Sequence, residues 1–299
     1  LEVADRLIAA RVALVSLSGG EPLAHPGWEI LARRLSVGGV TVSMLTSGSV
    51  WEADTALRLR AAGVGRVWLG VDGVGEAHDR FRGRPGLWEL VCRSLDDLKA
   101  AGVDAGVFTT VRASTASGIG ALAAWIRDRG VTDWFLWAAV GPGGHTDDFS
   151  RAEVERAVGD AGAVGDAGAV GTRIWFGDTW RPDGVGRPGK VGRPGKVGRP
   201  GTVACGAGET VLGISADGQV RGCLLQVGAP SVGHVLEAEL DVLAARARMR
   251  RRADGCTALS PLGPTCASPG SGTSVNWQAA ALVPLAALAL GVGACRSNE

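Results

Sequence analysis

The chain has 299 residues, of which 46% are hydrophobic, and a formal net charge of +1. This length suffices for one large or two modest domains with a full core, and the balanced charge excludes the strongly basic surface of a nucleic-acid-binding protein. The segment from Leu1 to Arg11 contains charged residues and no long apolar run, so no secretory signal is expected and a cytoplasmic location is predicted.

Residues 1–150 alternate between short apolar runs and amphipathic stretches. Strands are predicted at 12–17, 40–45, 66–71, 105–111 and 133–140, and helices near 27–36, 52–62, 86–101 and 117–129. Regular alternation of strands and helices indicates a parallel sheet, either as a barrel or as a doubly wound sheet. In both architectures ligands bind at the carboxyl ends of the strands.

The segment Ser18-Gly19-Gly20-Glu21-Pro22 follows directly on the first expected strand. Two glycines let main-chain groups approach a ligand closely, the proline stiffens the exit, and the carboxylate orients hydrogen-bond donors. Ser47, Asp72 and Thr110 stand at the ends of three other expected strands. Their convergence predicts one binding site for a small charged ligand.

Beyond residue 150 the pattern changes. Ser150 and Glu153 form a capping box for one more helix, and tandem Gly-rich repeats follow, of which 184–203 is interpreted as a flexible linker. A hairpin is expected around Ala216-Asp217-Gly218, and then a helix near 236–252. The uncharged run 279–295 lies at the lower limit for a membrane span. A tail inserted into a membrane is one hypothesis, and the alternatives are a packed helix or an artefact of where the reading frame ends.

Four segments together resemble radical S-adenosylmethionine (SAM) enzymes that modify peptides, over roughly residues 1–145. They are the Gly-Gly-Glu-Pro loop, 45–48, 67–83 with its Asp-Gly, His-Asp and Arg-Gly pairs, and 109–111. The resemblance implies a (β/α) TIM-like barrel of the radical SAM type that lacks its first strand.

The same resemblance implies site residues. Gly19, Gly20 and Glu21, with Pro22 closing the loop, would receive the ammonium group of SAM. Its ribose hydroxyls and carboxylate would be received by Ser47, Asp72 and Thr110, although a turn-forming role for Asp72 is an equal alternative.

Two further features of 67–83 bear on that site. His78-Asp79 is expected to fix the loop together with Arg82 rather than to act in acid–base chemistry. Gly70 stands where the family often has serine, so one polar contact is expected to be lost.

One departure from the family concerns the cluster that cleaves SAM. The family holds this [4Fe–4S] cluster with a CxxxCxxC motif upstream of the Gly-Gly-Glu-Pro loop, and none of the 17 residues before Ser18 is cysteine. We expect that the sequence starts late, through truncation, and the alternative is a genuine loss that leaves a pseudoenzyme. The chain as given is predicted not to cleave SAM.

The carboxyl-terminal cysteines suggest a second module. Cys205 and Cys223 frame Gly218 in a C-x₁₂-G-x₄-C pattern that resembles the start of a SPASM or twitch domain. With Cys256 and Cys266 they are predicted to hold one auxiliary [4Fe–4S] cluster, the alternatives being a Zn²⁺ site or a metal-free module. Cys92 is predicted to be a core cysteine.

The predicted organisation is a partial radical SAM barrel at 1–150, a helix and repeat linker at 151–203, a SPASM/twitch domain at 204–270 and an apolar tail at 271–299. The resemblance implies a 5′-deoxyadenosyl radical that acts on a peptide or protein substrate, with a flavodoxin or ferredoxin as reductant. Tetrapyrrole side-chain chemistry is an alternative substrate class. A non-catalytic SAM-binding scaffold protein is an alternative function, and no nucleic-acid partner is expected.

Overall fold

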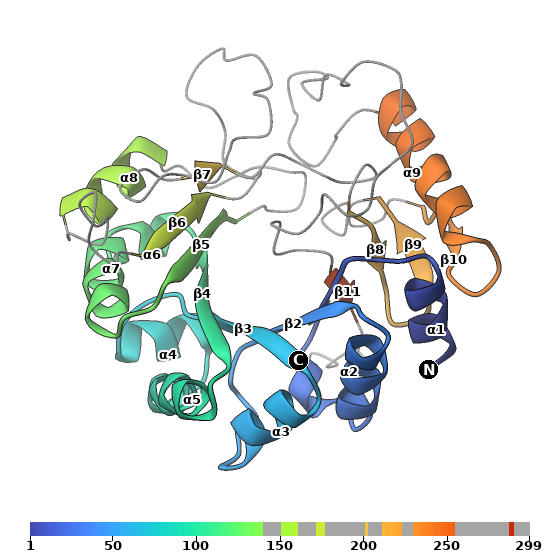
Figure 1. Ribbon diagram of the computed structural model, residues 1–299. Coiled ribbons are helices and arrows are strands. Elements are labelled where there is room, and N and C mark those ends of the chain that lie inside the picture. Colours follow the sequence, from blue (N-terminus) through green and yellow to red (C-terminus); the bar gives the residue numbers. More distant parts are fainter. Residues whose placement is uncertain are drawn as a thin grey trace, which may run out of the picture.

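The computed structural model describes residues 1–139, 151–160, 172–176, 201–202, 211–222, 230–254 and 287–289 (Figure 1). Its centre is a curved, mainly parallel sheet with helices on its outer side (Figure 1). This is the α/β fold expected from the sequence, a partial (β/α) barrel.

The five expected strands are all present and pair in chain order. They are β1 (Leu14–Ser18), β2 (Thr41–Thr46), β3 (Val64–Gly70), β4 (Asp104–Val111) and β5 (Asp133–Ala138). Every neighbouring pair is parallel, so the five carboxyl ends lie along one edge. This edge carries Gly19, Ser47, Asp72 and Thr110, as predicted.

Four expected helices are also present: α2 (Trp28–Val37), α3 (Thr55–Ala61), α5 (Leu87–Ala101) and α7 (Ile119–Asp128). The sequence reading missed α1 (Glu2–Ala9), the 3₁₀ turn η1 (Pro22–Ala24), α4 (Glu76–Arg82) and α6 (Ala113–Ala116). All four are short, and short helices show little periodicity.

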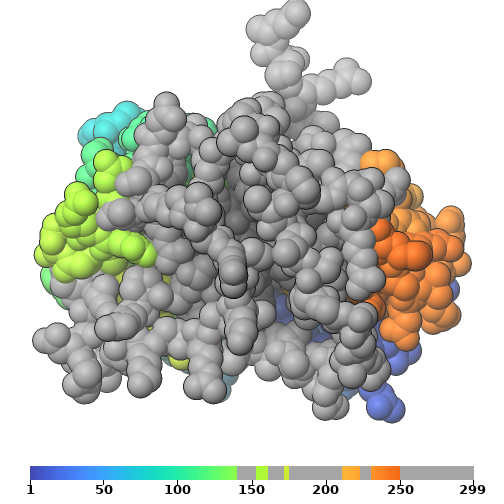
Figure 2. All heavy atoms as spheres, turned by 90° about the horizontal axis from the view of Figure 1, so that it is seen from above, coloured from blue at the N-terminus to red at the C-terminus, as the bar shows by residue number. Residues whose placement is uncertain are grey.

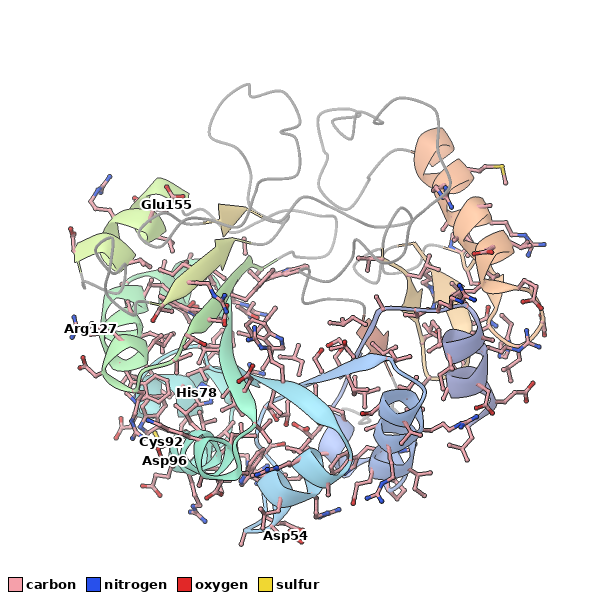
Figure 3. All side chains as sticks on the ribbon, viewed as in Figure 1. Asp54, His78, Cys92, Asp96, Arg127 and Glu155 are labelled. Atoms are coloured by element: carbon pink, nitrogen blue, oxygen red, sulfur yellow. The ribbon has the colours of Figure 1, made fainter. Side chains whose placement is uncertain are left out.

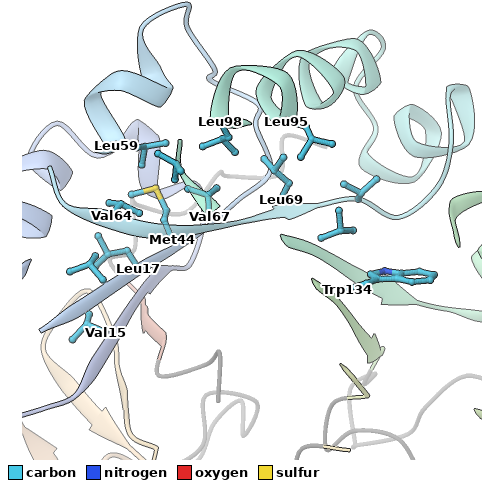
Figure 4. Close-up of a cluster of buried hydrophobic side chains, with 14 of the residues drawn as sticks. Val15, Leu17, Met44, Leu59, Val64, Val67, Leu69, Leu95, Leu98 and Trp134 are labelled. Carbon is cyan, nitrogen blue, oxygen red and sulfur yellow. The ribbon is translucent and has the colours of Figure 1, made fainter. Parts of the chain in front are cut away.

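The main core lies between the sheet and the outer helices. Val67 and Leu69 of β3 are buried beside Leu95 and Leu98 of α5, and Trp134 of β5 belongs to the same core (Figure 4). Because side chains alternate along a strand, the residues between them face the opposite side, here called the inner face.

The sheet continues past residue 150, where the first domain was expected to end. After α8 (Arg151–Asp160), β6 (Arg173–Phe176) pairs in parallel with β5, and β7 (Gly201–Thr202) pairs with β6. Part of the segment interpreted as a linker therefore extends the sheet.

The expected hairpin and the last expected helix are confirmed. β8 (Gly213–Ile214) and β9 (Gln219–Arg221) are antiparallel around the predicted turn, and β10 (Gly233–His234) adds to β9. Helix α9 (Leu240–Asp254) follows, and Figure 2 shows it on the opposite side of the molecule from α8.

The described part of the tail is β11 (Ala287–Ala289), which lies between β1 and β8 and is parallel to both. A packed helix was one of the alternatives for this run, whereas its described residues form a strand. Within the described ranges, no helix is long and apolar enough to cross a membrane.

Candidate functional site at the carboxyl ends of β1 to β4

The loop after β1 leaves room for a ligand at its second glycine. Gly19 has a φ of 127°, a conformation that side chains disfavour. Gly20 has no such restriction, and a Cβ placed on it would find no atom within 4 Å. Among the described residues, none donates a hydrogen bond to the carbonyl oxygen of either glycine. Within the described part of the chain, the loop therefore presents carbonyl oxygens without a donor beside open space.

Glu21 joins this loop to the end of β2. Its carboxylate accepts hydrogen bonds from the hydroxyl of Thr46 at 2.6 Å, and from the amide and hydroxyl of Ser47 at 2.9 and 2.5 Å. It also accepts one from the amide of Leu23, at 3.2 Å, as the cap of η1. Pro22 begins η1 and is buried. Both carboxylate oxygens are thus in use, and Glu21 positions the loop.

Asp72 joins the ends of β3 and β4. One oxygen accepts from Arg82 Nε and the other from the amide of Thr110, each at 2.7 Å. The Asp72 side chain is fully buried, and this burial raises its pKa, against the opposing effect of Arg82 and the Thr110 amide. Asp72 and Thr110 meet as predicted, but the Asp72 carboxylate is occupied by protein groups.

The segment after Asp72 is held by local hydrogen bonds of His78 and Asp79, the loop-fixing role expected of this pair. The Asp79 carboxylate accepts from the amides of Gly86 and Trp88, at 2.6 and 2.7 Å, at the start of α5. His78 Nδ1 accepts from the amide of Asp72 at 3.2 Å, so the proton of the neutral ring is on Nε2. Burial, with a smaller contribution from Arg82, lowers the pKa of His78 to about 4. His78 is therefore neutral at pH 7.

The guanidinium of Arg82 lies against the backbone of Gly70. A Cβ on Gly70 would lie 2.7 Å from Arg82 Nη2, so a serine there would require the end of the guanidinium to shift. Sequence reasoning treated Gly70 only as a lost polar contact. The glycine could have been linked to Arg82 only through the three-dimensional structure, because the two residues are 12 positions apart.

The cysteines fall into two groups. Cys92 lies on α5, close to Asp96 in Figure 3, and it is partly buried rather than in the core as predicted. Burial raises the pKa of its thiol. The four predicted cluster ligands (Cys205, Cys223, Cys256 and Cys266) lie outside the described residues.

The described residues suit SAM and do not suit the cluster that cleaves it. Free carbonyls, open space at Gly20 and hydroxyls at neighbouring strand ends match an amino acid joined to a nucleoside. No group of three or more His, Cys, Asp or Glu side chains in the described ranges could hold a metal.

Sequence comparisons relate the amino-terminal part to one superfamily. The profile of the Radical SAM superfamily matches residues 1–113. The AdoMet-dependent heme synthase of Methanosarcina barkeri is 31% identical over 157 residues, which are 52% of this chain and 45% of that protein. The sporulation killing factor maturation protein SkfB of Bacillus subtilis is 28% identical over 114 residues, 38% of this chain and 28% of SkfB. The chain thus spans less than half the length of these relatives.

Solved structures show the same fold. SuiB of Streptococcus suis bound to S-adenosylmethionine matches with a TM-score of 0.58 at 13% identity, over 80% of this chain and 56% of SuiB. SuiB bound to the precursor peptide SuiA matches with a TM-score of 0.59 at 14% identity, over 81% of this chain and 57% of SuiB. At these identities the likeness concerns the fold.

Proposed function

Because residues 1–113 belong to the radical SAM superfamily, we propose that the carboxyl edge of β1 to β4 binds S-adenosylmethionine. The observation that carries the proposal is the loop at Gly19 and Gly20. It has two carbonyl oxygens without a described donor and open space at the second glycine. An ammonium group is a donor that such carbonyls satisfy.

The neighbouring residues have separate tasks in this proposal. The carbonyls of Gly19 and Gly20 accept from the ligand ammonium, and Ser47 and Thr110 offer hydroxyls to its polar groups. Glu21 and Asp72 act indirectly, because their carboxylates hold Ser47 and Thr110 in place. SAM, when bound, supplies the 5′-deoxyadenosyl group of the superfamily's radical chemistry.

The iron–sulfur part of the proposal rests on the sequence. Cys205, Cys223, Cys256 and Cys266 are proposed to hold one auxiliary [4Fe–4S] cluster, with Zn²⁺ as the alternative metal. The cysteines that would hold the SAM-cleaving cluster have no counterpart among the described residues. The described cysteine, Cys92, lies on an outer helix. We therefore propose that this 299-residue chain binds SAM without cleaving it, and that a flavodoxin or ferredoxin serves as reductant where the cleaving cluster is present.

Two substrate classes are compatible with the relatives. A peptide or protein substrate is supported by the names of SkfB, a maturation protein, and of SuiB, which was solved with a precursor peptide. A tetrapyrrole is supported by the more extensive sequence match to a heme synthase.

Calorimetric titration of the purified chain with SAM tests the proposal, with ATP as the control ligand. ATP shares the adenosine group of SAM but lacks its amino acid. We expect saturable binding of one SAM per chain and no comparable binding of ATP. The absence of SAM binding, or equal binding of both compounds, would overturn the proposal.

A second assay tests the prediction about cleavage. The chain is reconstituted anaerobically with iron and sulfide, reduced, and incubated with SAM. No 5′-deoxyadenosine is expected above the background of a protein-free control. Its detection would show that the chain holds a cleaving cluster.

A further inference from the structure

The hydrogen-bond ladder between β3 and β4 changes at its carboxyl end, beside the proposed SAM site. Its last regular bond joins the amide of Val71 to the carbonyl of Phe108, at 2.9 Å. In a parallel pair the next bond would join the amide of Thr110 to the carbonyl of Val71. Instead, the Thr110 amide donates to Asp72 at 2.7 Å. The Val71 carbonyl accepts from the hydroxyl of Thr109, at 2.5 Å. Two bonds to side chains thus stand in place of one backbone bond.

The Thr109 hydroxyl is itself oriented by Trp134, on the neighbouring strand β5. The indole N–H of Trp134 donates to Thr109 Oγ1 at 2.9 Å. An indole nitrogen can only donate, so the hydroxyl accepts from Trp134 and directs its own proton to Val71. The direction of both bonds is therefore fixed. A chain of two hydrogen bonds connects β5, β4 and the end of β3.

Thr109 and Trp134 lie on the outer side of the sheet, away from the proposed ligand. Both are fully buried, and Trp134 belongs to the core beneath the outer helices (Figure 4). Side chains alternate along a strand, so Thr110 is on the inner face, where it is half-buried. Thr109 therefore acts on the site only through the atoms that it bonds.

The Thr109 hydroxyl leaves the Thr110 amide available to Asp72. Val71 is fully buried, and a buried carbonyl without a donor is costly, so its oxygen needs a partner. Two donors can serve it: the Thr110 amide, as in a regular ladder, or the Thr109 hydroxyl. Because the hydroxyl takes this carbonyl, the amide remains for the buried carboxylate of Asp72, which needs donors of its own.

A valine at position 109 would reverse this arrangement. Valine has the shape of threonine and suits a strand, but it has no hydroxyl to donate or accept. The Val71 carbonyl would then draw the Thr110 amide back into the ladder, and Asp72 would lose one of its donors. The indole N–H of Trp134 would lose its acceptor as well.

We propose that Thr109, oriented by Trp134, is a positioning residue of the SAM site. Its hydroxyl keeps the Thr110 amide on Asp72 and so gives the end of β4 the shape that receives the ligand. The inference rests on the proposed function and extends it to two residues that touch no ligand. The site then depends on β5 as well as on β1 to β4.

Calorimetric titration of variants of the full chain with SAM tests the proposal. Thr109→Val should raise the Kd for SAM about tenfold, whereas Thr109→Ser keeps the hydroxyl and should bind nearly as the wild type does. Trp134→Phe removes only the N–H that orients the hydroxyl and should raise the Kd severalfold. The matched control is Thr172→Val. Thr172 is also buried and donates to a backbone carbonyl, that of Val131 at 2.8 Å, but it precedes β6 at the opposite edge of the sheet. Its loss should leave the Kd unchanged.

The amide of Thr110 gives a readout that needs no ligand. In the wild-type chain its short bond to a carboxylate, 2.7 Å from nitrogen to oxygen, should place its proton resonance downfield in an NMR spectrum. Thr109→Val should move this resonance upfield, because the amide then bonds to a neutral carbonyl. Thr109→Ser and Thr172→Val should leave it in place.

The outcomes separate this inference from the proposed function. Thermal unfolding first shows which variants are folded, and Trp134→Phe replaces Thr109→Val if the latter is not. Wild-type SAM affinity or an unchanged Thr110 resonance in folded Thr109→Val overturns the inference. An equal loss of affinity in Thr172→Val, or no recovery in Thr109→Ser, overturns it too. A wild-type chain that fails to bind SAM overturns the proposed function itself, which is a different result from each of these.

Discussion

The carboxylate of Glu21 binds Ser47 twice, through the Ser47 amide at 2.9 Å and its hydroxyl at 2.5 Å. These two residues are 26 positions apart and belong to loops that follow different strands. The pair fixes the Gly-Gly loop relative to the end of β2. The proposed SAM site therefore depends on Glu21 for its shape.

Glu21→Gln should destabilise the site. The amide has one acceptor oxygen where the carboxylate has two, and its NH₂ group would face donors of Ser47 or Thr46. We expect the free energy of unfolding to fall by about 1–3 kcal/mol in urea titrations, and the SAM affinity to fall with it. Glu76→Gln is the control, because Glu76 forms only an exposed pair with Arg80. Equal stability of the two variants would contradict the role of Glu21.

His78 should make stability depend on pH. Its pKa in the folded protein is about 4, below the usual 6.5, so the unfolded state binds more protons between these values. The free energy of unfolding is therefore highest above pH 6.5, and it decreases by up to about 3 kcal/mol as the pH falls toward 4.

The measurement compares the wild-type chain with His78→Gln by urea unfolding at pH 7, 6, 5 and 4. Glutamine keeps an acceptor for the Asp72 amide but does not titrate. The difference in unfolding free energy between the two proteins should therefore change across this range. A constant difference would show that His78 is accessible to protons in the folded state.

Arg82→Met should be among the more destabilising substitutions in this region. It leaves the fully buried carboxylate of Asp72 without its charged partner, at a cost of about 3 kcal/mol. Arg80→Met, two residues away, breaks only an exposed pair and should change stability little. The double variant with Asp72→Asn removes the unpaired charge and should recover part of the loss. Thermal and urea unfolding measure the stability of all three variants. A double variant no more stable than Arg82→Met would refute this explanation.

Much of the fold could be predicted from local patterns. The helix 86–101 was visible because Leu87, Val91, Leu95 and Leu98 recur at helical spacing, and Gly102 ends it in the left-handed conformation. The placement of Gly19, Ser47, Asp72 and Thr110 at one edge of the sheet could be expected from the alternation of strands and helices.

The bonds within the site could not be predicted in this way. Nothing near Glu21 in the sequence indicates that its carboxylate binds Ser47, and a loop glutamate is equally suited to a ligand. The spatial match of Gly70 with Arg82 and the stacking of Phe108 on Phe135 depend on which strands are neighbours. Such relationships can be predicted only when the order and register of the strands are known.

The assignment of the auxiliary cluster to the carboxyl-terminal cysteines is tested by measuring the iron content of the purified chain. After anaerobic reconstitution the chain should bind one [4Fe–4S] cluster, and the double variant Cys205→Ala, Cys223→Ala should lose it because two thiolate ligands are removed. Cys92→Ala is the control, since Cys92 lies on α5 and should leave the iron content unchanged. Iron retained in the double variant would refute the assignment, and zinc in the purified chain would support the alternative metal.

The central claim is that SAM occupies the open space at Gly20, and calorimetric titration of Gly20→Val with SAM tests it most directly. The valine side chain meets no protein atom within 4 Å of its Cβ, so the fold should persist while the ligand space is filled. Gly159→Val on α8 is the matched control, with a Cβ that is equally free of contacts. We predict that Gly20→Val abolishes SAM binding and that Gly159→Val binds as the wild type does. A folded Gly20→Val protein with wild-type SAM affinity would contradict the account.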